Sequence, residues 1–140
     1  MLLKQLSVFI ENREGRLEKV TEVLAKNGVN ITSFSLADTS EYGLLRMIVD
    51  NPMRGRNVLK EEGFSVILTD VIAIELPYEL GALNNIMKTL QDVNIEYIYV
   101  LSTGSKPSII LKSDDAKKAI EILEKDGFSL LGEEAYTINN

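Results

Sequence analysis

The chain of 140 residues is long enough for one domain or for two small ones of about 70 residues. It has no cysteine and no histidine, which removes disulfides, thiolate chemistry and the usual general base at neutral pH, and which counts against an enzyme. Residues 1–69 carry nine basic and nine acidic side chains, whereas residues 70–140 carry six lysines, no arginine and twelve acids, so the net charge of −6 lies in the second half. That acidic half speaks against nucleic acid as a partner.

Long apolar runs and a signal-peptide pattern are both lacking, so we expect a cytoplasmic protein without membrane association. The absence of Cys and His also leaves no expectation of a metal site or a cofactor.

In the first half, alternating and helical periodicities predict six elements. They are a strand at residues 3–11, a helix at 15–26 closed by Gly28, a strand at 31–37, a strand at 44–49 after a polar hairpin loop at 38–43, a helix from 52 to 63, and a strand at 64–68. Asn51 and Pro52 form a typical helix start, with Asn as the cap and Pro at the first position.

The second half predicts the same order of elements. They are strands at 71–76, 95–101, 108–112 and 128–137, helices at 81–91 and 115–126, and a hairpin loop at 102–105. We expect Ser113 or Asp114 to cap the last helix and Gly127 to end it. Thr69 and Asp70 join the two halves almost directly.

Matched anchors show that the chain is an internal duplication. Gly15, at the start of the first predicted helix, recurs as Gly81 at the start of the third. The Asn-Ile pair at 30–31 recurs at 94–95, and the Gly-Phe-Ser stretch at 63–65 recurs at 127–129, in the same order along the chain. We therefore expect two domains, at residues 1–69 and 70–140.

The order βαββαβ in each half predicts two tandem ferredoxin-like units of the α+β class, each with an antiparallel four-stranded sheet and two helices on one face. Five apolar side chains are expected on the helix side of the first sheet: Leu6, Val8, Ile10, Phe34 and Leu36. Four others are expected on the opposite faces: Phe9, Met47, Tyr97 and Tyr99. We expect those opposite faces to be partly covered, by the other repeat or by another chain.

The stretch at residues 12–17, Asn-Arg-Glu-Gly-Arg-Leu, lies where a strand pattern gives way to a helical one. A glycine there permits a tight turn and leaves the first helix amides open to an anion such as a carboxylate. Arg13 and Arg16 either help to hold that anion or form part of a solvated face. The stretch at residues 77–83, Pro-Tyr-Glu-Leu-Gly-Ala-Leu, is the second copy.

These residues resemble the ACT domain, a βαββαβ module whose first loop commonly reads Asn-Arg-Pro-Gly-x-Leu and whose first helix is followed by Gly-x-Asn-Ile. Residues 12–17 and 28–31 match, with Glu14 in place of Pro. The second repeat keeps Gly81, Leu83 and the Asn-Ile pair but has Tyr78 where the loop Asn is expected. The whole chain is thus similar to tandem ACT proteins without a catalytic domain.

The resemblance implies a non-catalytic regulator of amino-acid metabolism that binds a free amino acid between ACT units, with a homodimer and a partner metabolic enzyme as expected assemblies. The implied ligand-binding residues of the first repeat are Asn12, Arg13, Glu14, Gly15, Arg16, Leu17, Asn30 and Ile31. Those of the second are Tyr78, Leu80, Gly81, Ala82, Leu83, Asn94 and Ile95. Asn at positions 30 and 94 is also explained by turn geometry alone.

Three other functions are compatible with this fold. RNA recognition needs aromatic side chains on a central strand and a basic face, and the strand at residues 44–49 has no aromatic residue. An acylphosphatase-like enzyme usually has a single unit and a more Gly-rich loop. The main alternative is a structural module that pairs with a partner enzyme and binds no ligand.

Overall fold

The computed structural model describes residues 2–38, 41–101 and 106–136. The chain divides into two compact units, which we describe separately. The first unit comprises Lys4–Thr69, and the second comprises Asp70–Asn140 together with Met1–Leu3. The hairpin loop predicted at 102–105, and residues 39 and 40 of the loop predicted at 38–43, lie outside the described residues.

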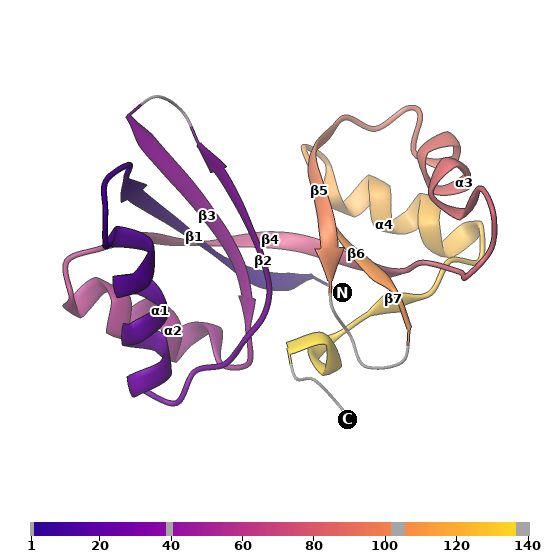
Figure 1. Cartoon of the computed structure of the whole chain (residues 1–140). Coiled ribbons are helices and arrows are strands. Elements are labelled where there is room, and N and C mark those ends of the chain that lie inside the picture. Colours follow the sequence, from indigo (N-terminus) through magenta and orange to yellow (C-terminus); the bar gives the residue numbers. More distant parts are fainter. Residues whose placement is uncertain (1, 39–40, 102–105, 137–140) are drawn as a thin grey trace. The chain divides into compact units, whose positions relative to one another are not determined.

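The first unit has the predicted order of elements. They are β1 (Leu3–Glu11), α1 (Arg16–Lys26), β2 (Ile31–Asp38), β3 (Tyr42–Val49), α2 (Pro52–Glu61) and the first part of β4 (Ser65–Glu75). The strand order is β2-β3-β1-β4, and β3 runs antiparallel to both β1 and β2. Helices α1 and α2 lie side by side on one face of this sheet (Figure 1). This is the ferredoxin-like arrangement.

The second unit repeats that arrangement. Its elements are the end of β4, α3 (Ala82–Thr89), β5 (Ile95–Leu101), β6 (Ser108–Ser113), α4 (Ala116–Lys125), β7 (Leu130–Leu131) and a 3-10 turn (Glu133–Tyr136). The strand order is β5-β6-β4, with β7 paired to β4, so each strand has the same place as its counterpart in the first unit. The α+β class and the tandem ferredoxin-like units are therefore confirmed.

The last predicted strand, 128–137, is wrong over most of its described length. Only Leu130 and Leu131 pair as a strand. The backbone N–H of Gly132 donates to a carboxylate oxygen of Glu134 at 2.9 Å, and that of Ala135 donates to the Gly132 carbonyl at 3.0 Å. Local bonds of this kind compete with a strand ladder, so the chain turns after Leu131.

The two strands predicted on either side of Thr69 and Asp70 are one strand. Strand β4 has eleven residues and passes through both positions without a break. Neither Gly nor Pro, the strongest turn-forming residues, occurs between Ser65 and Glu75.

One of the two predicted helix N-caps is confirmed and the other is wrong. The Asn51 side chain accepts a hydrogen bond from the Arg54 amide at 3.2 Å, as predicted. In the last helix the cap is Asp115, whose carboxylate accepts from the Lys118 amide at 3.1 Å, so the prediction of Ser113 or Asp114 was wrong. Ser113 instead accepts from the amide of Asp115 at 3.1 Å and so fixes the residue that forms the cap.

Cross-strand register decides which side chains enter the first core. Met47 lies opposite Leu6 and is fully buried on the helix side, so its predicted place on the other face was wrong. Phe34 and Leu36 share that helix face, opposite Met47 and Leu45, but they stay 69% and 47% exposed. They are not part of the core because β2 is the edge strand of the sheet.

The second unit has a separate core under its own two helices. Its buried members come from β4, α3 and the segment after it, β6 and α4: Ile72, Ile74, Ile86, Leu90, Val93, Ile109, Leu111, Ala119 and Leu123. On the other face of this sheet the rings of Tyr97 and Tyr99 stack with centroids 6.4 Å apart, and both side chains are half-buried.

Candidate functional site

The two glycine loops have the same backbone conformation. Gly15 has φ 81° and ψ −10°, and Gly81 has φ 82° and ψ 6°, in the left-handed region that glycine tolerates best. Equivalent hydrogen bonds hold both loops: Arg13 N–H to the Glu11 carbonyl and Glu79 N–H to the Pro77 carbonyl, each at 2.9 Å. The duplication thus extends to the geometry of the loops.

In both loops a set of backbone amides is left open at the start of a helix. Within the described residues, no hydrogen bond engages the amides of Glu14, Gly15 and Leu17 in the first loop. The same holds for Leu80, Gly81 and Leu83 in the second. Amides at a helix start, with the positive end of the helix dipole, favour an anion such as a carboxylate.

A cavity of about 360 Å³ lies beside the first loop. Its lining comes from the end of β1, the loop, the start of α1 and two strands of the sheet: Ile10, Glu11, Asn12, Arg13, Leu17, Leu36 and Gly43. Gly43 helps to keep this space open, because a Cβ there would lie 3.1 Å from Cγ1 of Ile10 and 3.2 Å from Cδ1 of Leu36. The cavity therefore combines polar loop groups with an apolar floor.

The two loop arginines have different surroundings. The Nε atom of Arg13 lies 3.0 Å from a carboxylate oxygen of Glu11, and both side chains are well exposed. The guanidinium of Arg16 instead stacks over the ring of Phe64, 4.4 Å from its centroid. Arg16 is not in the cavity lining, so Arg13 is the cation of this cavity.

Asn30 and Ile31 lie at the other end of β2 from the first loop. Asn30 is tied to Asp50, since its amide donates to the Asp50 carboxylate at 2.9 Å and its carbonyl accepts from the Asp50 amide at 3.0 Å. Strand β2 has eight residues, so its two ends are about 25 Å apart. Within one unit, Asn12 and Asn30 cannot contact the same small ligand.

The second loop lines a larger and less polar cavity of about 650 Å³. Its lining contains five of the predicted residues and no lysine or arginine: Leu76, Pro77, Tyr78, Glu79, Leu80, Gly81, Ala82, Leu83, Asn84 and Pro107. The side chains of Tyr78 and Leu80 are almost fully exposed. The other two predicted residues, Asn94 and Ile95, are at the start of β5, where the Asn94 carbonyl accepts from the Asp114 amide at 3.3 Å.

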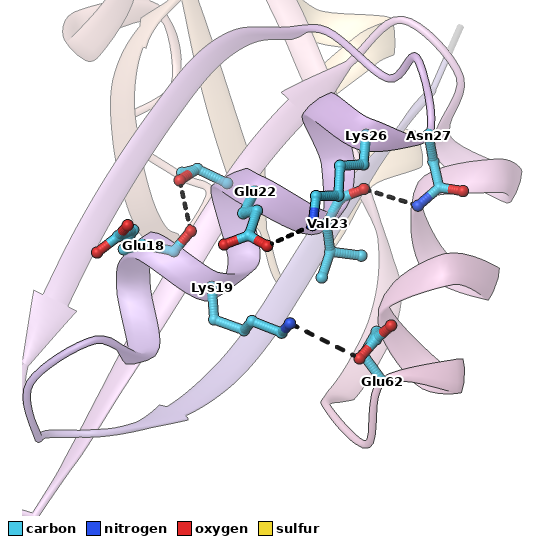
Figure 2. A network of polar contacts seen from close by, with 8 residues as sticks. Glu18, Lys19, Glu22, Val23, Lys26, Asn27 and Glu62 are labelled. Carbon is cyan, nitrogen blue, oxygen red and sulfur yellow. Dashed lines mark hydrogen bonds and ion pairs between the residues drawn. The ribbon is translucent and has the colours of Figure 1, made fainter.

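The outer surface of α1 carries polar contacts, which Figure 2 shows. Lys26 pairs with Glu22 one turn earlier at 2.8 Å, and Lys19 lies 4.0 Å from Glu62 just after α2. The hydrogen bond from Lys26 lowers the pKa of Glu22 below its ordinary value, and the same bond raises the pKa of Lys26. These exposed pairs support the helix and do not contribute to the cavity.

Sequence reasoning missed the sheet residues of the first cavity. Ile10, Leu36 and Gly43 come together because Ile10 lies opposite Gly43 and Leu36 lies on the neighbouring edge strand. The periodicity of the strands places such side chains on a face, but the pairing register was needed to find them.

The described residues contain no group of three acidic side chains able to hold a metal ion. Among the described helices, none has the length and apolar character needed to cross a membrane.

A family model described as an ACT domain pair matches residues 1–138. The chain belongs to this family. Protein BT0572 of Bacteroides thetaiotaomicron is 36% identical to the ACT pair, and the two structures superpose with a TM-score of 0.92. The match covers 99% of the ACT pair and 98% of the BT0572 chain. A comparison with curated proteins gives no significant match.

More distant solved structures share the fold of the ACT pair. The ligand-free regulatory subunit of aspartate kinase from Thermus thermophilus is 17% identical, with a TM-score of 0.63 over 89% of the ACT pair and 92% of the subunit. Aspartate kinase from Clostridium acetobutylicum, described as an allosteric enzyme, is 16% identical, with a TM-score of 0.51 over 96% of the ACT pair and 33% of the enzyme chain.

Proposed function

We propose that the ACT pair is a non-catalytic sensor that binds a free amino acid at the first glycine loop and regulates amino-acid metabolism in the cytoplasm. The observation that carries the proposal is the cavity of about 360 Å³ beside Asn12 and Arg13, next to the open amides of Glu14, Gly15 and Leu17. A site that small, with a few polar groups on an apolar floor, suits a small molecule. Membership of the ACT family also supports an amino-acid site.

The polar groups of the loop match the two charges of an amino acid. The ligand carboxylate accepts hydrogen bonds from the open loop amides and from the Arg13 guanidinium. The Asn12 side-chain oxygen and the Glu11 carboxylate are acceptors for the ligand ammonium. The second loop offers the same amides but has Tyr78 in place of Asn12, so we propose the first loop as the main site.

We further propose that a homodimer completes the site. Asn30 precedes the start of an eight-residue strand whose other end lies near the loop, so it is about 25 Å from the loop of its own unit. If Asn30 binds the same ligand as Asn12, it comes from a second copy of the chain. Each dimer then has two equivalent sites, each with Asn12 of one copy and Asn30 of the other.

Mixing two variants tests this arrangement. Asn12→Ala and Asn30→Ala each remove a side-chain amide from every site, so each homodimer binds weakly. Subunit exchange between them leaves one site per heterodimer with both amides intact. We expect calorimetry on the exchanged mixture to recover about a quarter of the wild-type sites. Recovery of none, while Asn12→Ala alone weakens binding, excludes a shared site; unchanged binding by both single variants excludes these side chains as ligand contacts.

One observation favours a second function, assembly with a partner enzyme without a ligand. Tyr78 and Leu80 are large, almost fully exposed side chains on one loop, and aromatic side chains are enriched in protein interfaces. The two functions differ in their response to Tyr78→Ala, which removes a partner contact but leaves the first loop unchanged. Loss of co-purifying enzyme with intact amino-acid binding assigns assembly to this second loop.

A further inference from the structure

We infer that the ligand of the first unit is an amino acid with a large apolar side chain, such as leucine, methionine or phenylalanine. This inference rests on the proposed amino-acid site. It comes from a second cavity, of about 320 Å³, on the helix face of β2. Seven residues line it: Leu17, Thr21, Ile31, Phe34, Leu36, Leu45 and Met47.

The two cavities adjoin. Leu17 at the start of α1 and Leu36 on β2 line both of them. A ligand whose carboxylate and ammonium are held by the loop therefore has a path for its side chain, between these two leucines and into the second cavity. The loop groups recognise what all amino acids share, and the second cavity selects among them.

The second cavity has the chemistry of a pocket for hydrocarbon. Its floor is formed by Leu45 and Met47, which are buried, and its rim by side chains of β2 and α1 that are partly open to solvent. No charged residue lines it, and Thr21 supplies its single side-chain hydroxyl. A lysine, glutamate or arginine side chain loses its hydration there without a partner, whereas an apolar one gains from leaving water.

The exposure of the rim also points to an occupant. Leu17, Phe34 and Leu36 lie on the helix face, where the neighbouring side chains of β3 and β1 are buried, yet they remain 41%, 69% and 47% exposed. A bound side chain covers this apolar surface and joins it to the core. Because burying a leucine-sized side chain strengthens binding strongly, we expect leucine-class ligands to bind at least tenfold more tightly than alanine.

The test uses calorimetry with six ligands: L-leucine, L-methionine, L-phenylalanine, L-alanine, L-lysine and L-glutamate. Leu36→Ser makes the shared wall polar at an exposed position, so the fold is retained. Val100→Ser is the matched control, since Val100 is the counterpart of Leu36 in the second repeat and lies on β5. We expect Leu36→Ser to weaken the best apolar ligand about tenfold or more and to leave alanine unchanged, whereas Val100→Ser changes neither.

Three results overturn the inference and are distinguishable. If alanine, lysine or glutamate binds best, Asn12→Ala weakens it and Leu36→Ser does not, the amino-acid site stands and the apolar preference fails. If none of the six ligands binds, and none of the other fourteen amino acids binds when added to the same test, the proposed function fails and the inference with it. If Leu36→Ser leaves every affinity unchanged but lowers the molecular mass seen by light scattering, the second cavity is a contact between copies of the chain.

Discussion

At the scale of single residues, substitutions at the two loop glycines distinguish an effect on the stability of the fold from an effect on ligand binding. Gly15 and Gly81 have φ near +80°, where other residues are strained, and beyond the adjacent residues no described heavy atom lies within 4 Å of the position of an added Cβ. A substitution at either glycine therefore acts through the backbone and through the space next to the open amides, not through a clash inside the core.

We expect Gly15→Val and Gly81→Val to lower the free energy of unfolding by similar amounts, about 1–2 kcal/mol or more, since each forces a β-branched residue into the left-handed region. Urea unfolding measures both. Only Gly15→Val should also abolish amino-acid binding, because only the first loop is proposed to hold the ligand. Equal loss of binding in the two variants contradicts that asymmetry.

The residues of the first cavity show how far sequence reasoning reaches at this scale. Asn12, Arg13 and Leu17 were predicted from a local motif, and all three line the cavity. Leu36 and Gly43 were not, because they reach the cavity through strand pairing between residues distant in sequence. Arg16 stands beside the same glycine, but its stacking on Phe64 depends on a tertiary contact that a motif cannot reveal.

At the scale of helices and strands, the two repeats differ in the residue at which the second helix packs against the sheet. Gly55 in α2 lies against the sheet, where an added Cβ would be 2.9 Å from Cδ1 of Leu6. Its counterpart in the second repeat, in α4, is Ala119, which is fully buried. The first unit thus needs a closer approach of helix and strand at this point.

Gly55→Val is expected to destabilise the chain by about 1–3 kcal/mol, because the added carbons overpack the contact with Leu6. Asn57→Val in the same helix is the control, since Asn57 is exposed and Asn and Val have similar helix propensity. Chemical denaturation of both variants gives the comparison. If Gly55→Val loses no more stability than Asn57→Val, overpacking against Leu6 is contradicted, because Val is a better helix former than Gly.

The Glu22–Lys26 pair predicts a pH dependence. Because the pKa of Glu22 is lowered by Lys26, its contribution to stability is present above the ordinary glutamate pKa and is lost as pH falls through the lowered value. Glu22→Gln should therefore be less stable than wild type at pH 7 and approach it near pH 3. Urea unfolding at the two pH values checks this. A difference that persists at pH 3 assigns the effect to something other than the charge.

The order of the elements and most of their bounds followed from periodicity, as for β5, whose predicted range of 95–101 matches the structure. Two of the errors occurred where local hydrogen bonds set the backbone conformation. Asp115 rather than Asp114 caps α4, and the Gly132–Glu134 bond turns the chain where a strand had been predicted. Both features depend on the geometry of single side chains, which the pattern of apolar residues does not reveal.

At the scale of the whole molecule, the proposed site needs a second copy of the chain, so we expect a homodimer at micromolar concentration. Multi-angle light scattering should give twice the chain mass of 15.6 kDa. The mass should stay at that value when the ligand is added. A single-chain mass at high micromolar concentration, together with full amino-acid binding, means that one copy forms the complete site.

Thermal unfolding with each of the twenty amino acids tests the central claim, that the ACT pair binds a free amino acid at its first loop. A ligand at 100 times its Kd adds about 2.7 kcal/mol, which raises the Tm by several degrees for a chain of this size. Asn12→Ala should lose that shift, and Tyr78→Ala, at the equivalent position of the second loop, should keep it. Binding at the first loop is contradicted if no amino acid raises the Tm, or if Tyr78→Ala loses the shift while Asn12→Ala keeps it.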